Sequence, residues 1–186
     1  NGNGNTPNPG MTSVASGNVW MGNDTFRITV GNTDGALLNR VNYFGIGTVG
    51  LTGLQWANIH FNIGASRFDI NSFSSRGNTG DVVRLDFNVG GFGVSLSTDT
   101  TGTFNPAGTN TEDAIAVSYN FGDWTVAAGY AANASASRVA INGVAAGTLG
   151  DVVSLSVAGS IGDFGVGLGY TDKERIGNKV TLAGSY

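Results

Sequence analysis

The 186-residue sequence contains no cysteine, so it offers neither a disulfide framework nor a thiolate metal site. Charged residues make up only 12% of the chain, and the nine basic residues form no cluster of the kind that binds nucleic acid. No apolar run approaches the ~20 residues that a membrane-spanning helix needs. The first ten residues also lack the basic and apolar regions of a signal peptide, and we expect that one was removed or that the sequence begins partway through a protein.

Glycine is abundant, with 31 residues, and it separates stretches in which apolar residues alternate with small or polar ones. The clearest stretch is 115–130. There Ile115, Val117 and Tyr119 share one face of a strand, because successive side chains of a strand point to opposite faces. Beyond Gly122 the alternation resumes, as expected for a β-hairpin. Three such hairpins predict a β-meander, with the other two at 82–98 and 152–171.

Weaker alternation near both ends adds three strands, which brings the expected total to nine. Short turns on one side, long loops on the other and a mean hydropathy near zero are typical of outer-membrane barrels, whose strands alternate lipid-facing and lumen-facing residues. The predicted fold is an all-β antiparallel transmembrane β-barrel meander, a single unit over residues 1–186. The weaker strands are expected at 14–20, 25–30 and 179–186, and the longer loops at 31–80, 99–113, 133–151 and 172–178.

Charged residues in the middle of strands assign the two faces. Arg27, Arg84 and Asp86 lie opposite apolar neighbours such as Phe26 and Leu85. An arginine on the lipid side would cost about 2–4 kcal/mol, so the charged face is expected to line a water-filled interior. Arg27 directly precedes the 31–80 connection and is expected to line a constriction. For Arg84 and Asp86 the sequence leaves open that they are rim charges or a salt bridge in the lumen, with no bearing on selectivity.

Aromatic residues provide a second indication of a membrane barrel. Phe121 and Trp124 flank a short turn, while Tyr130 and Tyr170 end strands toward the long loops, as in the two interfacial girdles of such proteins. A soluble core would instead need a second layer to cover these aromatics, and the sequence predicts no amphipathic helix that could supply one.

Motifs that would indicate an enzyme are weak. The segment 45–50 matches the dinucleotide fingerprint G-x-G-x-x-G, but β-forming residues follow where a helix is required. His60 is the only histidine, and no serine has the context of a nucleophile. We therefore expect no enzyme, no cofactor and no metal centre, although carboxylates of the long loops leave calcium binding open.

Three segments resemble the general porins of α-proteobacteria, similar to those of Rhodobacter: 114–130, 166–172, and 28–36 leading into a long loop. The resemblance implies a 16-stranded homotrimeric barrel, of which this chain is an internal portion. It also implies that the 31–80 loop folds inward as the constriction loop, so that Asp34 and Arg40 join Arg27, Arg84 and Asp86 as pore-lining residues. The loop departs from the family in its few acidic residues and its additional arginines, which argues against strong cation selectivity.

The sequence thus predicts an outer-membrane porin for passive diffusion of small hydrophilic solutes and ions. Its expected partners are membrane lipid, lipopolysaccharide, two further copies of itself and those solutes, with no nucleic acid. Two alternatives remain. One is a structural protein or adhesin with a plugged barrel and no transport role. The other is a small closed barrel of eight to ten strands that ends at the aromatic Tyr186.

Overall fold

The computed structural model describes residues 17–31, 33–41, 82–99, 112–135, 149–175 and 177–186. Within these ranges the chain forms nine strands and one short helix, α1, at Ala36–Arg40. The strands are β1 Asn18–Gly22, β2 Phe26–Gly31, β3 Val82–Val89, β4 Phe92–Asp99, β5 Asp113–Phe121, β6 Trp124–Ser135, β7 Leu149–Ile161, β8 Phe164–Lys173 and β9 Gly177–Ser185. The early part of the first expected strand, His60, the fingerprint at 45–50 and most of the 31–80 loop lie outside the described residues.

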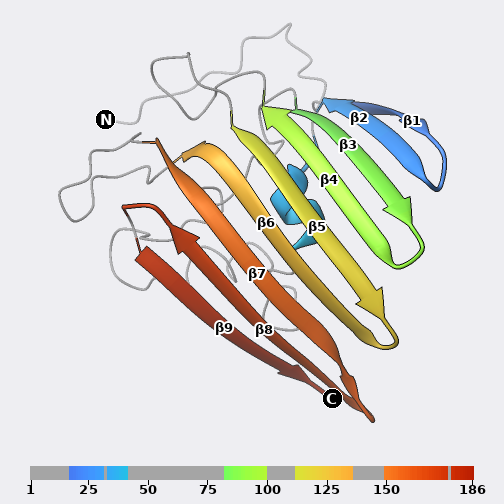
Figure 1. Cartoon of the computed structure of the whole chain (residues 1–186), viewed down its shortest axis with the longest axis vertical. Coiled ribbons are helices and arrows are strands. Elements are labelled where there is room, and N and C mark those ends of the chain that lie inside the picture. The colour runs from blue at the N-terminus through green and yellow to red at the C-terminus, as the bar shows by residue number, and fades with distance from the viewer. Residues whose placement is uncertain (1–16, 32, 42–81, 100–111, 136–148, 176) are drawn as a thin grey trace, which may run out of the picture.

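All nine strands belong to one sheet, in which each strand pairs antiparallel with the next in sequence. This order confirms the predicted all-β antiparallel meander (Figure 1). Within the described residues the sheet is open, with β1 and β9 as its two edges.

Three of the hairpins close through two-residue turns that begin with glycine. Gly90, Gly122 and Gly162 have φ of 57°, 55° and 59°. A positive φ at the first central residue is the feature that type II′ hairpin turns require, and glycine adopts it without steric cost. The short turns lie together at one end of the strands, as the alternation of connection lengths predicted (Figure 1).

Strands β6 and β7 are longer than the sequence predicted. β6 continues past Ala132 to Ser135, and β7 begins at Leu149, three residues before the expected Val152. Their pairing includes a β-bulge between Ala131 and Ala134, at which Asn133 has φ of 55°. Asparagine tolerates the left-handed conformation better than most residues, which allows the extra residue of the bulge. A bulge interrupts the strict alternation of apolar and polar residues, which was the signal that predicted the strand. The predicted end of β6 therefore came too early.

The two faces of the sheet differ in chemistry. One face, called outward here, presents apolar side chains that remain exposed, among them Phe87, Leu155 and Leu168 at 48%, 48% and 47% exposure. The opposite face, called inward, carries small and polar side chains such as Ser95, Ala116 and Ser154, all of them buried. An uncovered apolar surface of this extent marks a membrane or protein interface.

Candidate functional site

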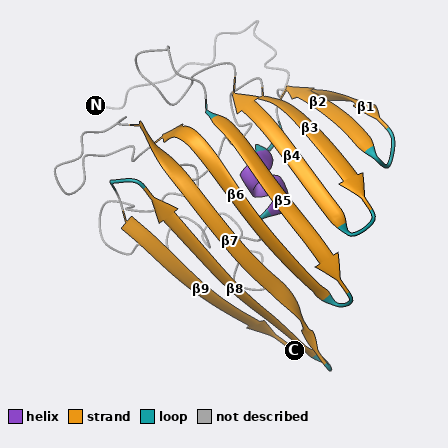
Figure 2. Cartoon of the chain, in the orientation of Figure 1, coloured by secondary structure: helices purple, strands orange, loops and turns teal. Residues whose placement is uncertain are grey.

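Helix α1 packs against the inward faces of β4, β5 and β6 (Figure 2, purple). Leu37 is fully buried, and it forms a small apolar core with alanines of the wall such as Ala116 and Ala127. This helix was not predicted, because five residues are too few to show helical periodicity. A helix this short is also unstable by itself in water, so the packing of Leu37 stabilises it.

Glycines in the strands make room for this segment. A Cβ atom at Gly129 would lie 3.1 Å from Cδ1 of Leu37, and one at Gly93 would clash with the guanidinium of Arg40. A side chain at Gly129 would therefore require Leu37 to shift, and one at Gly93 would require the Arg40 side chain to move. The small residues of β4 to β6 form a shallow seat whose shape matches the helix.

Arg84 and Asp86 form a buried ion pair beside this seat. Nε of Arg84 lies 3.0 Å from Oδ2 of Asp86, and their side chains are 11% and 8% exposed. The Nη1 group of Arg84 also donates to Oγ1 of Thr33 at 3.1 Å and to the carbonyl of Asp34 at 2.7 Å. Strand β3 thus holds the start of the loop through one arginine.

A second set of hydrogen bonds attaches α1 itself. Nδ2 of Asn39 donates to Oδ1 of Asp86 at 2.8 Å and to Oγ of Ser95 at 2.9 Å, and Nε of Arg40 donates to the same Oγ at 2.8 Å. The backbone N–H of Ala36 donates to Oγ of Ser97 at 2.8 Å. Because Asp86, Ser95 and Ser97 on the wall are buried, these bonds are stronger than they would be in water. We call Arg84, Asp86, Ser95, Asn39 and Arg40 the clamp.

Arg40 adds charge to the clamp. The pKa of Arg40 lies below its ordinary value. Burial lowers it most, the nearby Asp86 partly raises it again, and Arg84 lowers it further. A guanidinium nevertheless stays protonated in proteins. Its Nη2 lies 4.0 Å from Oδ1 of Asp86, so a single carboxylate faces two cations.

The structure brings four of the five predicted site residues together. Arg84, Asp86 and Arg40 meet in the clamp, and Asp34 contributes its backbone carbonyl while its side chain is exposed. Arg27 lies on the same inward face, outside the clamp. Their role as pore-lining residues stays a prediction. The sequence reading missed Ser95, Ser97, Asn39 and Leu37, since the only available signal was the run of small residues on the facing strands.

Arg27 has an aromatic neighbour instead of a carboxylate. Its Cζ lies 4.3 Å from the centroid of the Trp20 ring, a cation–π contact across the β1–β2 pair. Trp20 is 57% exposed, whereas Thr29, its cross-strand partner, is 2% exposed. The Nε of Arg27 and the Oγ1 of Thr29 are buried, and neither has a hydrogen-bond partner among the described residues.

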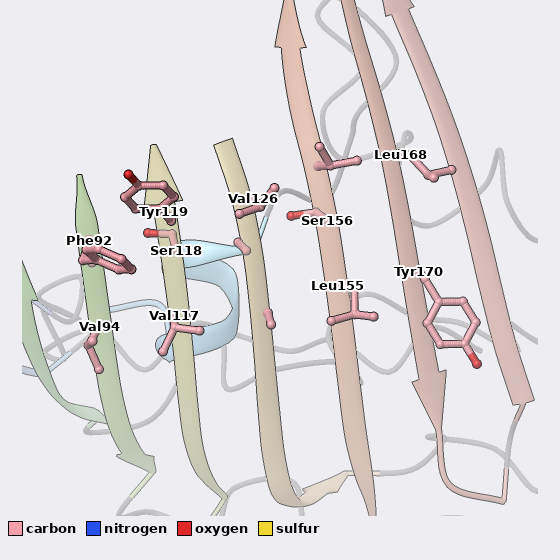
Figure 3. A pocket seen from close by; sticks show the side chains of 14 residues that line it. Phe92, Val94, Val117, Ser118, Tyr119, Val126, Leu155, Ser156, Leu168 and Tyr170 are labelled. Atoms are coloured by element: carbon pink, nitrogen blue, oxygen red, sulfur yellow. The ribbon is translucent and has the colours of Figure 1, made fainter. Parts of the chain in front are cut away.

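A hollow of about 670 Å³ lies on the outward face of β4 to β8, turned away from α1 (Figure 3). Phe92, Tyr119 and Tyr170 contribute rings to its wall, and Leu155 and Leu168 contribute aliphatic side chains. Among the described residues, no charged side chain lines it. It is therefore a recess in the apolar surface and no part of the polar site.

Two searches of the described residues were negative. They contain no group of three or more histidine or acidic side chains placed to hold a metal ion. They also contain no helix long and apolar enough to span a membrane.

The nine-stranded antiparallel meander is similar to the sheets of solved porin structures. Two solved structures of engineered Rhodopseudomonas blastica porins are similar to the chain, each with a TM-score of 0.59. The first structure is 19% identical in sequence, and the alignment covers 92% of this chain and 56% of the porin chain. The second is 20% identical and aligns with 96% of this chain and 60% of its own.

The chain thus has the sheet of a Rhodobacter-type porin, as the resemblance implied, and it spans somewhat more than half the length of those structures. No protein-family model matches the sequence, and no curated protein matches it.

Proposed function

We propose that this chain forms part of an outer-membrane channel through which small hydrophilic solutes and ions diffuse passively. The observation that carries the proposal is the position of α1. A loop segment bearing charged residues is bound to the inward face of a porin-type sheet, while the other face remains apolar. A polar interior with an inward segment fits a water-filled lumen whose width a loop reduces.

In this proposal residues 31–80 form the constriction loop, and the clamp fixes its first part to the barrel wall. Arg27, Arg84, Asp86, Asp34 and Arg40 then set the electrostatic field of the pore. The support is that all five lie on the inward face or in the segment bound to it. Selection would follow pore width and the field of these charges.

The proposed surroundings follow from the same barrel. The apolar outward face would contact membrane lipid, and the long-loop side would face lipopolysaccharide. The barrel would assemble as a homotrimer, as the resemblance to general porins implies. The outward hollow lined by Leu155 and Leu168 would be filled by acyl chains, because its lining is almost entirely apolar.

Reconstitution into planar lipid bilayers tests the proposal. We expect stepwise conductance increments that vary little with voltage, since a constriction held by buried bonds stays open at rest. A liposome-swelling assay with sugars of increasing size should give a rate that falls with solute size.

A folded protein that inserts but passes neither ions nor sugars would overturn the channel and would favour a plugged structural barrel or adhesin. Folding is checked in the same samples by the resistance of the barrel to unfolding in detergent, so that missing conductance is not confused with a misfolded chain.

A further inference from the structure

We infer that Arg27 and Thr29 form a binding site for the oxyanion group of a passing solute, a carboxylate or a phosphate. This inference rests on the proposed channel and names the class of solute that its wall would hold. The site lies on the inward face of β2, beside the ring of Trp20 on β1.

The charge of Arg27 is left without a counterion by the clamp. Arg27 and Asp86 are cross-strand partners in the β2–β3 ladder, a position from which an ion pair is expected. The carboxylate of Asp86 instead binds Arg84, Asn39 and Ser95. Within the part of the chain that the structure describes, Arg27 makes no ion pair.

The surrounding charges favour an anion. The inward faces of β2 and β3 together with α1 carry three arginines and one buried aspartate. The carboxylate of Asp34 is exposed, and that residue meets Arg84 only through its backbone carbonyl. An anion near Arg27 would therefore complete the charge balance that one aspartate cannot supply for three cations.

Two unsatisfied donors point to the same acceptor. Buried polar groups are normally hydrogen-bonded, so an orphaned donor requires an explanation. Nε of Arg27 and Oγ1 of Thr29 both lack a hydrogen-bond partner among the residues that the structure describes. The two residues share one face of β2 because they are two positions apart. A group with several acceptor oxygens can satisfy both donors at once.

The donor set matches an oxyanion better than a halide. A guanidinium presents its N–H groups as a planar fork that fits the two oxygens of a carboxylate or phosphate. The hydroxyl of Thr29 adds a donor from the side. The ring of Trp20, which keeps more than half of its surface exposed, lies against the guanidinium of Arg27 and can hold the Arg27 side chain in place.

Single-channel recordings with potassium acetate, potassium phosphate and potassium chloride test the site. A binding site in a pore makes conductance saturate, and we expect saturation at lower concentration for acetate and phosphate than for chloride. Arg27→Gln should raise the half-saturating concentration of the oxyanion about tenfold or more, because charge-assisted hydrogen bonds are lost. Thr29→Val should raise it a few-fold. Whichever of acetate and phosphate saturates the conductance at the lower concentration is the oxyanion that the site prefers.

Arg175→Gln is the matched control, since Arg175 is an exposed arginine between β8 and β9 that pairs with Glu174. The Arg175→Gln variant should have the same half-saturating oxyanion concentration as the wild type. The half-saturating concentration of Arg27→Lys should lie between those of the wild type and Arg27→Gln. Equal saturation in Arg27→Gln and wild type would overturn the site while leaving the channel intact. An effect of Arg27→Gln without one of Thr29→Val would reduce the site to a long-range charge and overturn the two-residue assignment. Absence of conductance in the wild type would instead refute the proposed function itself.

Discussion

Asp86 faces Arg27 across the β2–β3 pair yet forms its ion pair with Arg84, whose Nε lies 3.0 Å from its Oδ2. This choice of partner has two consequences. The Arg84–Asp86 pair, being buried, can hold the loop segment at the wall through Thr33 and Asn39. Arg27, on the inward face, keeps its charge without an ion-pair partner among the described residues.

The Asp86→Asn substitution should release α1. It leaves the buried guanidinium of Arg84 without its counterion, and breaking one side of a buried pair costs about 3–5 kcal/mol. Hydrogen exchange at the backbone amides of Asn39 and Val41, which close the turn of α1, should become faster. Asp123→Asn, at an exposed turn, is the control and should leave this exchange unchanged. Unaltered protection in Asp86→Asn would show that the clamp does not hold the helix.

A pair of engineered cysteines can test the docked position directly, because the chain has no cysteine of its own. The amide of Ala36 lies 2.8 Å from Oγ of Ser97, so Ala36→Cys with Ser97→Cys should cross-link under mild oxidation. Loss of free thiols is the measurement. The control pair replaces Ser97→Cys by Thr98→Cys, which places the thiol on the outward face. Equal cross-linking of both pairs would contradict the docked geometry.

Gly129→Val should displace α1 by overpacking. The added side chain would meet Leu37 and the Cβ of Ala116, each 3.1 Å from the position of a Cβ. Overpacking of this kind costs about 1–3 kcal/mol, so hydrogen exchange in α1 should rise. Ala128→Val, one residue away and on the outward face, should have little effect on that exchange. If both variants behave alike, Gly129 is not needed for the helix to approach.

Leu168→Arg should impair insertion into lipid. Leu168 lies in the middle of β8 on the outward face, at 47% exposure, and an arginine near the middle of a membrane costs about 2–4 kcal/mol. Denaturant-induced unfolding from lipid vesicles measures the loss of stability. Ala158→Arg, at a half-buried residue on the inward face of β7, is the matched control. A larger loss in the control than in Leu168→Arg would reverse the assignment of the two faces.

The sequence determined the sheet and its two faces. Side chains of a strand alternate, so the positions of Ile115, Val117 and Tyr119 were enough to predict a strand and its apolar face, and Gly122 was enough to predict the turn. The same rule placed Arg27, Arg84 and Asp86 on one face before any contact was known.

Tertiary structure alone decided what those residues touch. The helix at Ala36–Arg40 has no periodic signal, because its stability comes from Leu37 packing on alanines of β5 and β6, far away in the sequence. The partner of Asp86 was equally unpredictable, since Arg27 and Arg84 are both its neighbours on one face. Hydrogen bonds from Asn39 of α1 and Ser95 of β4 fix the direction of its carboxylate. Alternation is a local property of the backbone, whereas ion pairs and helix docking depend on which segments of the folded chain approach each other.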